Sequence, residues 1–595
     1  MKISRVIINN FRNLRHVDVT LSRTVALIGE NNSGKSNFLR AIMLPFMADE
    51  AGIMMKNLSW SDINRKARDE YYQYIQENQK RLSNRNLSEE ALTELKNDLK
   101  DHLPVVAVEA YLEPEDYPDG YDELYSLKDL SVEIDADRIQ YVIRYEFKPD
   151  KIDDIFHLVQ AVLIDASRTD VLNNEDTFLK VKMNLLPVEF YTYSIFIPGR
   201  SPVPYDTLRQ FRYTALEAER DDFSRSKERL GSKALVRVLQ KSLTNEDKIK
   251  IEKEYTSFLN ELKGLEDIQN IINWQEVSDF KEAEKFFEHI NILPNIPPVQ
   301  SLLNSVRLGY LDEGMNLQGL GFRNLILMVL LINSMRINKD EAALNILTVE
   351  EPEAHLCINN IRLMANFFNA VIGESKTTQL FYSTHSTEFI NKMDLKNVII
   401  LHDGQAFSLL EELEEEERDY LTKNPNLDLF KLFFSKKCVL FEGISEEMLI
   451  RSYINSKKEL NDIEVISFHK GYKKIIEIWR KLNTGTDNKL GIIRDFDGQK
   501  NAQNNHEIYN DDKTICVRTT SESTLEPEIV KTGDNFKILN EKYPDMFECK
   551  TPDEMQELWV GMKAEAMLRI CKDIEQGELP GFQMPKHIQE VLDFM

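Results

Sequence analysis

The chain has 595 residues, 42% of them hydrophobic and 29% charged, which predicts a globular protein of two or three domains with a large core. Its net charge of −25 argues against a protein that coats nucleic acid by bulk electrostatics, but not against a nuclease with local basic patches and carboxylate-bound metal. No apolar run approaches the ~20 residues of a membrane span, and the N-terminus reads as an amphipathic strand rather than a signal peptide. Five scattered cysteines without a C-x-x-C pair predict a cytoplasmic protein without zinc or disulfides.

The first forty residues predict a strand, a turn, two further strands, a loop and a helix. The loop is GENNSGKS at residues 29–36, which fits the phosphate-loop pattern G-x-x-x-x-G-K-[ST] at every fixed position. A strand before it and a helix after it are the setting that the motif requires. Lys35 would reach the β- and γ-phosphates, and Ser36 would hold Mg²⁺ through its hydroxyl. The expected nucleotide-binding residues of the loop are Gly29, Asn31, Asn32, Ser33, Gly34, Lys35 and Ser36.

The run NFRNL at residues 10–14, followed by a phosphate loop, resembles the opening of ABC-type ATPases of the SMC, RecF and OLD (overcoming lysogenization defect) kind. Residues 56–104 are polar with helical spacing, and they predict a helical insertion on the ATPase surface. The segments 105–113, 142–148 and 161–170 are expected to continue the sheet.

Residues 205–295 are strongly helical and charged, and two interpretations remain open. The segment is either a coiled arm used for dimerisation, which the OLD resemblance favours, or a helical subdomain packed on the ATPase. Its basic stretch 224–241 is either a solvated helix face or a surface that tracks DNA. The acidic run 411–419 is the clearest change in composition, and we place a domain boundary there.

An acidic strand end supplies the expected partners of the phosphate loop. The apolar run NILTV at residues 345–349 is followed directly by Glu350 and Glu351. We expect Glu350 near the Mg²⁺ of the nucleotide and Glu351 to polarise the attacking water as general base. His385 follows the next apolar strand, where ABC enzymes keep a histidine that contacts the γ-phosphate. ABC proteins usually carry Asp before the base, and the Glu found here is what the OLD resemblance leads us to expect.

The turn LQGLG at residues 317–321 opens an apolar helix and occupies the position of the ABC signature. It departs from the usual L-S-G-G form. In ABC dimers this helix start meets the γ-phosphate held by the other subunit. The resemblance therefore implies that Gly319 and Gly321 bind nucleotide across a homodimer or a higher homo-oligomer.

A second set of acidic residues lies beyond the boundary. The strand VLF ends at Glu442, and a later strand, LGII, is followed by Asp495 and Asp497. Sites in open α/β folds form at such strand ends, and alternation along the strand puts the two aspartates on one side. Convergent carboxylates are costly to bury without counter-charge, so the set predicts bound divalent metal.

Glutamate at one strand end and D-x-D at a later one resemble the TOPRIM domain of topoisomerases, primases and OLD nucleases. Glu446, one helical turn after Glu442, extends the resemblance. It implies Lys563 as a group that neutralises charge developing at the phosphate, and two Mg²⁺ or Mn²⁺ ions held by Glu442, Glu446, Asp495, Asp497 and Glu526. Between the two acid motifs lie cations that either contact the DNA backbone or form an ordinary helix surface: Lys470, Lys473, Lys474 and Arg480.

The predicted fold is α/β, an ABC-type ATPase head with a helical insertion and dimerisation arm, followed by a Rossmann-like TOPRIM domain. The expected boundaries are 1–204 and 296–410 for the two parts of the head, 205–295 for the arm, 411–430 for an acidic linker and 431–595 for TOPRIM.

The resemblance to OLD-family endonucleases covers nearly the whole chain. It implies an ATP-binding, metal-dependent endonuclease that nicks or cuts double-stranded DNA. It extends to Gabija-type and retron-associated nucleases of bacterial anti-phage defence, which leaves room for a companion protein or nucleic-acid complex as a partner. The alternatives are a repair ATPase that clamps DNA like SMC or RecF without cutting it, and a TOPRIM primase or strand-transferase.

Overall fold

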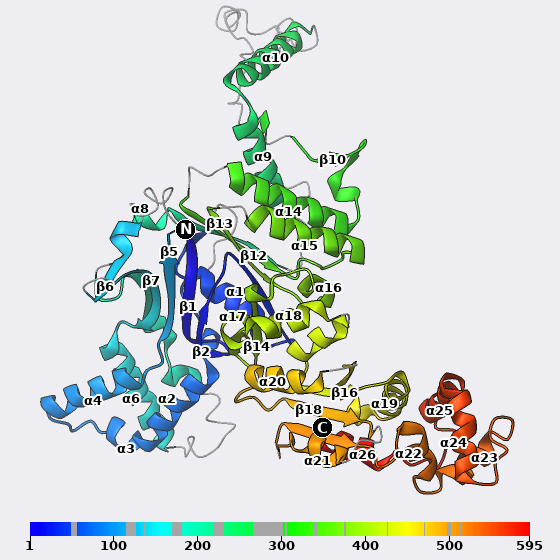
Figure 1. The fold of residues 1–595 in the computed structure, drawn as a ribbon. Helices are drawn as coiled ribbons and strands as arrows, with labels where there is room; N and C mark the ends of the chain where they lie inside the picture. The colour runs from blue at the N-terminus through cyan, green and yellow to red at the C-terminus, as the bar shows by residue number, and fades with distance from the viewer. Residues whose placement is uncertain are drawn as a thin grey trace, which may run out of the picture.

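In this computed structural model the chain forms two α/β units that share a hydrophobic core, with a helical arm projecting from the first unit (Figure 1). Within the part of the chain that is described, no helix is both long and apolar enough to cross a bilayer. The described residues are 1–48, 56–114, 127–135, 138–168, 181–200, 202–217, 230–265, 302–303, 306–337, 342–373, 376–424, 426–468, 471–496, 501–511 and 513–595.

A seven-stranded sheet forms the centre of the N-terminal unit, in the order β15-β14-β3-β13-β12-β9-β4. Neighbouring strands run parallel, except that the edge strand β15 pairs antiparallel with β14. Strand β3 is buried along its whole length, as expected where both faces of a parallel sheet are covered. The strands are β3 (Thr24–Gly29), β4 (Met47–Ala48), β9 (Phe211–Leu216), β12 (Leu344–Glu350), β13 (Thr378–Ser383), β14 (Val398–His402) and β15 (Gln405–Ser408).

An antiparallel sheet packs beside it, in the order β2-β1-β5-β7-β6 with β8 also paired to β7. Helix α1 (Lys35–Met43) shares one core with both sheets. Side chains of β3 alternate between this core and a second core on the opposite face, because successive residues of a strand point in opposite directions. The antiparallel strands are β1 (Lys2–Phe11), β2 (Leu14–Thr20), β5 (Val106–Glu113), β6 (Ser131–Asp135), β7 (Arg138–Pro149) and β8 (Tyr191–Phe196).

The predicted helical insertion at 56–104 forms α2 (Arg65–Glu77), α3 (Gln79–Leu82) and α4 (Glu89–His102) (Figure 1). Helices α3 and α4 contact α6 (Ile152–Arg168), which comes later in the chain. The prediction of a strand at 161–170 is wrong, because residues up to 168 belong to α6 and the last two lie outside the described residues. Ile155, Val159 and Leu163 recur every four residues and bury one face of this helix, which is helical rather than strand spacing.

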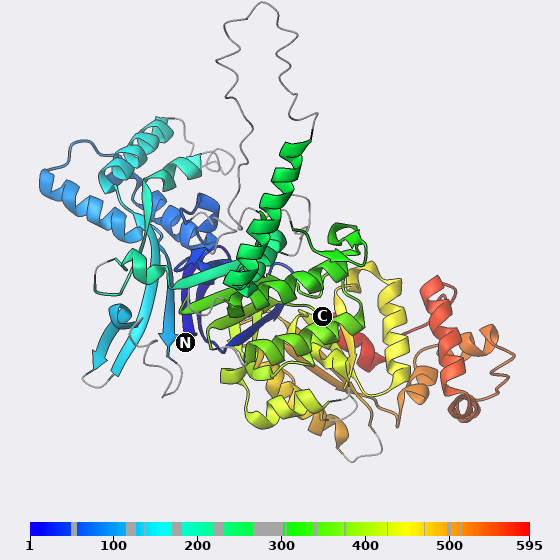
Figure 2. The ribbon, with the colours of Figure 1, turned by 90° about the horizontal axis from the view of Figure 1, so that it is seen from above.

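The helical segment predicted from residue 205 is interrupted by a strand. After the short α8 (Tyr205–Leu208), β9 enters the parallel sheet beside β12, so this part of the predicted arm belongs to the N-terminal unit. The reason is period-two burial, with Phe211 and Tyr213 in the core between the sheets. α9 (Leu230–Ser242) contacts α14 (Leu320–Ile337), and α10 (Asn245–Gly264) projects beyond it, away from the sheets (Figures 1 and 2).

The remaining elements of the N-terminal unit cover the second face of the parallel sheet. Helix α14 and α15 (Ile358–Gly373) lie there with the short α16 (Thr387–Ile390), and the hairpin β10 (Gly309–Tyr310)–β11 (Glu313–Gly314) precedes α14.

The predicted acidic linker 411–430 is folded. It forms α17 (Leu409–Glu412), α18 (Glu415–Lys423) and a 3-10 helix, η8 (Leu427–Phe433), whose apolar side chains join the core shared by the two units. Glu417 is only 2% exposed and accepts hydrogen bonds from the Lys481 ammonium, at 2.7 Å for the nearer oxygen. The excess of negative charge is therefore partly neutralised by the next domain.

The C-terminal unit is built on a four-stranded parallel sheet, in the order β17-β16-β18-β19. Cys438 and Leu440 of β16 face the shared core, whereas Val439 and Phe441 face a separate core of this unit. The strands are β16 (Lys437–Phe441), β17 (Ile463–Ser467), β18 (Lys489–Arg494) and β19 (Ile515–Thr519), and the helices are α19 (Ile444–Ser456), α20 (Tyr472–Leu482), α21 (Ala502–Glu507), α22 (Leu525–Lys531), α23 (Asn535–Lys542), α24 (Pro552–Gly561), α25 (Lys563–Gln576) and α26 (Lys586–Phe594).

Candidate nucleotide and metal sites

The phosphate loop joins the end of β3 to the start of α1, as the motif predicts. Gly29 and Gly34 both have positive φ angles, 149° and 118°, which side chains disfavour. A Cβ atom at Gly29 would lie 2.3 Å from the Leu401 carbonyl oxygen, and one at Gly34 would lie 2.9 Å from the Asn13 side chain. Glycine is therefore required at both ends of the loop. Without side chains at these two positions, the loop backbone can pack closely against Leu401 and Asn13.

The NFRNL turn holds the loop from outside. The Asn13 amide donates to the Asn32 carbonyl at 3.1 Å, and the Asn37 amide donates to the Asn13 side-chain oxygen at 2.8 Å. On the other side, the Gly404 N–H donates to the Ser33 carbonyl at 3.0 Å. In the sequence, NFRNL was notable only as part of a family resemblance. In the structure, its Asn13 side chain supports the phosphate loop through hydrogen bonds.

Lys35 folds back on its own loop. Its ammonium donates to the carbonyl oxygens of Gly29 at 2.7 Å and Glu30 at 2.6 Å. Burial lowers the pKa of Lys35 to about 8, against the opposing effect of nearby carboxylates, of which Glu351 is the strongest. The same cation would gain more from a phosphate than from two carbonyls, because charge-assisted hydrogen bonds are the stronger kind.

Two predicted Mg²⁺ contacts of the nucleotide site meet directly. The Ser36 hydroxyl donates to a carboxylate oxygen of Glu350 at 2.9 Å. Glu350 ends β12, two strands away from β3 in the sheet, so the sheet order brings together residues that are far apart in sequence. A hydroxyl and a carboxylate at this separation suit a shared Mg²⁺ ion.

Glu351 and His385 also meet at this edge. Glu351 has a positive φ of 43°, and its N–H donates to the Ser383 carbonyl at the end of β13 at 3.0 Å. One of its carboxylate oxygens lies 3.8 Å from Nε2 of His385. Burial and the Lys35 charge lower the pKa of His385, which Glu351 partly offsets.

Sequence reasoning missed Glu353, two residues further along. One of its carboxylate oxygens accepts hydrogen bonds from the Thr384 hydroxyl at 2.6 Å and from the His385 N–H at 2.9 Å. Burial raises the pKa of Glu353. This carboxyl group fixes the turn that carries His385, and the E-E-P-E spacing was the only signal for it in the sequence.

Of the two signature glycines, Gly319 directly precedes α14 and Gly321 lies in its first turn. A Cβ at Gly321 would lie 2.3 Å from the His355 carbonyl oxygen, whereas one at Gly319 would meet no atom of the described residues within 4 Å. Asn324 is buried and donates to the Ala354 carbonyl at 3.2 Å. The helix start is thus docked on the turn that follows Glu351.

In the C-terminal unit, the neighbouring parallel strands β16 and β18 are each followed directly by a predicted metal ligand, Glu442 and Asp495. The Asp495 N–H donates to a Glu442 carboxylate oxygen at 3.4 Å, and the other oxygen of Glu442 pairs with Arg494. Glu446 is buried in the first turn of α19, where its carboxylate lies against Gly443, since a Cβ there would be 2.4 Å from it. Glu442 and Asp495 therefore meet at one edge of the sheet, and Glu446 lies beside Gly443 in the turn that follows β16.

The rest of the predicted set is only partly placed. Glu526 is buried in the first turn of α22, after the neighbouring strand β19, and accepts a hydrogen bond from the Thr524 hydroxyl at 3.0 Å. Lys563 begins α25. Asp497 lies outside the described residues. Within the described part of the chain, no three acidic, histidine or cysteine side chains come close enough to hold a metal ion.

The basic helix α20 is largely occupied by contacts within the chain. Lys474 lies 3.8 Å from the buried Glu417, and Arg480 donates to the Tyr509 carbonyl at 3.0 Å. Lys473 lies over the Tyr509 ring at 5.9 Å, and Lys470 is outside the described residues. These contacts favour the interpretation of α20 as a helix surface.

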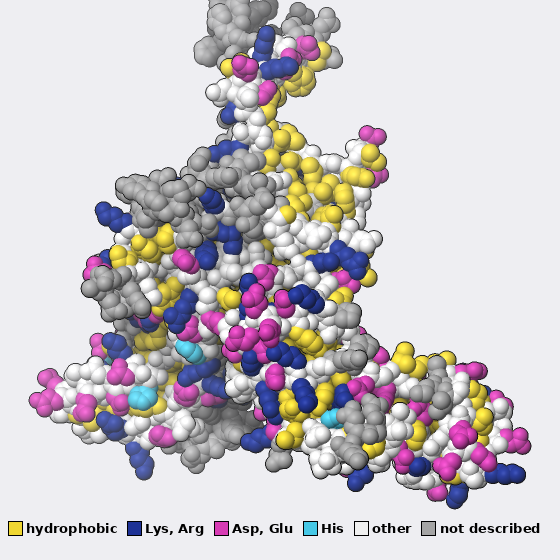
Figure 3. All heavy atoms as spheres, in the orientation of Figure 1, with side chains coloured by type: hydrophobic (Ala, Val, Ile, Leu, Met, Phe, Trp, Pro, Cys, Tyr) yellow, Lys and Arg dark blue, Asp and Glu magenta, His cyan; other side chains and the backbone are white. Residues whose placement is uncertain are grey.

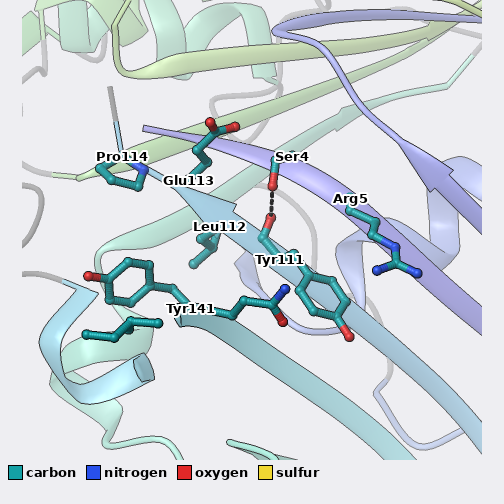
Figure 4. A pocket seen from close by; sticks show the side chains of 9 residues that line it. Ser4, Arg5, Tyr111, Leu112, Glu113, Pro114 and Tyr141 are labelled. Atoms are coloured by element: carbon teal, nitrogen blue, oxygen red, sulfur yellow. Dashed lines mark hydrogen bonds between the residues drawn. The ribbon is translucent and has the colours of Figure 1, made fainter. Parts of the chain in front are cut away.

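A pocket of about 240 Å³ on the antiparallel sheet lies among residues of β1, β5 and β7 (Figure 4). Its Ser4 hydroxyl donates to the Tyr111 carbonyl at 3.4 Å, and Arg5 on its rim pairs with Asp18 at 2.5 Å. None of its lining residues belongs to the acidic or glycine motifs.

Comparison with known families matches residues 1–390 to the AAA ATPase domain family and residues 433–497 to the overcoming lysogenization defect protein-like TOPRIM domain. The expected order of an ATPase head and an OLD-type TOPRIM domain is thereby confirmed. Endonuclease GajA from Bacillus cereus (strain HuB5-5) is 25% identical over 272 residues, which are 38% of this chain and 40% of that relative. The match thus spans about two fifths of the curated relative's length.

Among solved structures, the SMC head domain with an extended coiled coil from Pyrococcus furiosus aligns with a TM-score of 0.30 and 12% identity, covering 69% of this chain and 97% of that one. The SMC head domain from Thermotoga maritima aligns with a TM-score of 0.27 and 16% identity, covering 69% of this chain and 99% of that one.

Proposed function

The chain belongs to the AAA ATPase domain family and carries an OLD-like TOPRIM domain after it, and on that premise we propose that it is an ATP-binding, metal-dependent DNA endonuclease. The observation that carries the proposal is the meeting of two acidic strand ends, since Glu442 and Asp495 follow neighbouring parallel strands. Carboxylates gathered at such an edge are the donors that metal-dependent phosphodiester hydrolysis uses. The relative that matches the chain is named as an endonuclease.

Mg²⁺ or Mn²⁺ at this edge would activate a water and stabilise charge on the scissile phosphate. Lys563 is assigned to neutralise charge at the phosphate or the leaving oxygen. The side chains assigned to the metal are all carboxylates, a donor set that suits Mg²⁺ and Mn²⁺: Glu442, Glu446, Asp495, Asp497 and Glu526.

The N-terminal unit would bind ATP with Mg²⁺. Lys35 would leave the two carbonyls it now contacts and turn to the β- and γ-phosphates. Ser36 and Glu350 are assigned to the metal of the nucleotide, which their 2.9 Å contact supports. Glu351 would hold the attacking water as general base, with His385 at the γ-phosphate.

We place the second half of each ATP site on another copy of the chain, as a homodimer or a higher homo-oligomer. Among the described residues, nothing lies within 4 Å of a Cβ built at Gly319, which leaves room there for a ligand from outside its own chain. Apolar side chains gather on the surface over β10 and α14 (Figure 3), with Leu311 89% and Leu317 68% exposed. An apolar patch beside a helix start is suited to contact with a second head.

The substrate in this proposal is double-stranded DNA, nicked or cut, and the setting is bacterial anti-phage defence in the cytoplasm. The OLD-type domain pair and the match to an endonuclease support nuclease activity, and the defence setting is what the resemblance to OLD-family and Gabija-type nucleases implies. A companion defence protein or nucleic-acid complex is compatible with this setting.

Cleavage of supercoiled plasmid with Mg²⁺ or Mn²⁺ tests the proposal. The wild type is run beside Asp495→Asn and Lys35→Ala, each with and without ATP. We expect Asp495→Asn to lose cleavage while its ATP hydrolysis is unchanged, because Asp495 and the phosphate loop lie in different units. Lys35→Ala should lose ATP binding, and its cleavage then shows whether ATP drives or restrains the nuclease.

Cleavage that survives in Asp495→Asn would refute the assignment of the metal edge. If the wild type binds duplex DNA in a gel shift but never cuts it under these conditions, the DNA-clamp alternative replaces the nuclease.

A further inference from the structure

An arginine lies inside the acidic edge of the C-terminal unit. Arg494 is the last residue of β18, directly before Asp495, and its guanidinium pairs with the Glu442 carboxylate. The Arg494 side chain is 10% exposed and the Glu442 side chain 21% exposed. This guanidinium would compete with a bound metal ion for the Glu442 carboxylate, and its burial makes the ion pair costly to break.

Aromatic rings hold this guanidinium in place. It lies 4.4 Å from the ring centre of Tyr472 and 5.7 Å from that of Phe468. Its Nε has no hydrogen-bond partner among the described residues, so the rings and Glu442 are the contacts that fix its orientation there. Stacking on an aromatic face suits the planar, weakly hydrated guanidinium rather than an ammonium.

Glu442 is thereby held through both carboxylate oxygens. One oxygen pairs with Arg494, and the other accepts the Asp495 N–H at 3.4 Å. Each carboxylate oxygen has two lone pairs, so a metal can still bind while the carboxylate stays oriented.

We propose that Arg494 is a positioning residue for the metal site, which fixes the Glu442 carboxylate in its binding orientation from a stacked, buried guanidinium. This inference rests on the proposed metal edge of the nuclease. Two effects oppose each other, since the charge of Arg494 repels a metal ion while its hydrogen bond orders a ligand of that ion. We expect the ordering to dominate, because loss of a partner that orients a metal ligand typically weakens metal affinity by roughly 10- to 100-fold.

Mn²⁺ binding to the whole chain, followed by electron paramagnetic resonance without nucleotide or DNA, tests this directly. The binding lost in Asp495→Asn defines the contribution of the TOPRIM edge. Arg494→Gln and Arg494→Lys are compared with the matched control Arg518→Gln. Arg518 lies on the neighbouring strand β19, and its replacement removes an arginine–glutamate pair with Glu590 of α26. ATP hydrolysis and the thermal transition report whether each variant is folded.

We expect both Arg494 variants to bind Mn²⁺ about 10-fold more weakly and Arg518→Gln to bind as the wild type does. Arg494→Lys is decisive, because it keeps the charge but not the planar stacked fork. Wild-type affinity in Arg494→Lys, or tighter binding in Arg494→Gln, would overturn the inference in favour of a purely electrostatic role. Unchanged binding in both variants would overturn it while leaving the nuclease intact, whereas a wild type that binds no Mn²⁺ at this edge would remove the metal site as well.

Discussion

Glu30 of the phosphate loop is tied to Lys436, the residue that precedes β16 of the TOPRIM domain. One Glu30 carboxylate oxygen accepts the Lys436 N–H at 2.9 Å, and the other lies 3.6 Å from the Lys436 ammonium. That ammonium also lies 3.3 Å from Asp403, in the turn that supports the loop. Strand β16, which leads directly to Glu442, thus begins beside the phosphate loop.

Glu30→Ala should weaken communication between the two sites. Lys35 now contacts the Glu30 carbonyl, so its movement to a nucleotide would disturb the residue that holds Lys436. We expect the ATP-dependent change in the plasmid cleavage rate, whatever its direction, to shrink in Glu30→Ala. ATP hydrolysis should stay near that of the wild type. A full nucleotide response in the variant would mean that the signal takes another route.

ATP binding should depend on pH through Lys35. Burial lowers the pKa of Lys35 to about 8, whereas its unfolded value is near 10.4, so the nucleotide-free lysine loses its charge as pH rises past about 8. Phosphates bind the charged form. We expect ATP affinity to fall above about pH 8, toward tenfold per pH unit, with proton uptake on binding.

Calorimetry at pH 8.5 in two buffers of different ionisation enthalpy measures that proton uptake. The free energy of unfolding changes in the opposite direction. Between about pH 8 and 10 the Lys35 side chain is protonated in the unfolded chain but not in the native chain, so its contribution to the free energy of unfolding rises with pH in this range. An ATP affinity that is flat from pH 7 to 9.5 would contradict the prediction.

Glu351→Gln should separate ATP binding from ATP hydrolysis. A general base contributes roughly 10²- to 10⁴-fold to a rate, so phosphate release should drop by that order while nucleotide affinity is retained. Glu353→Gln is the matched control, since one Glu353 oxygen accepts both of its hydrogen bonds and a neutral amide can keep that role. Equal loss of hydrolysis in both variants would remove Glu351 from the role of base.

The shared core should couple the stabilities of the two units. Leu440→Ala removes a fully buried side chain from that core and should cost about 2–5 kcal/mol of unfolding free energy. Val439→Ala, the adjacent residue of the same strand, faces the separate core of the C-terminal unit. We monitor urea unfolding through the loss of ATP binding. The urea midpoint should fall more in Leu440→Ala than in Val439→Ala. Equal shifts would mean that the units unfold independently of this core.

Local patterns in the sequence predicted the elements that surround the candidate nucleotide site. The phosphate loop, the acidic end of β12 and the buried strands depend on spacing within a few residues, which sequence records directly. The same local reasoning failed at 161–170, where a short apolar run fits a helix as well as a strand, and at β9, where strand burial was hidden in a charged helical stretch.

Which residues meet across the fold was decided only by the tertiary structure. The sheet order places Ser36 against Glu350, and packing of the two units places Glu30 against Lys436. The pairing of Arg494 with Glu442 depends on β18 lying beside β16 and on a ring from α20. The sequence by itself determined the acids and the loop, because their chemistry is carried by residue type and local spacing. The residues that pair with these acids, and the contacts between the two units, come from segments far apart in the chain. Only the packing of sheets and helices brings these segments together.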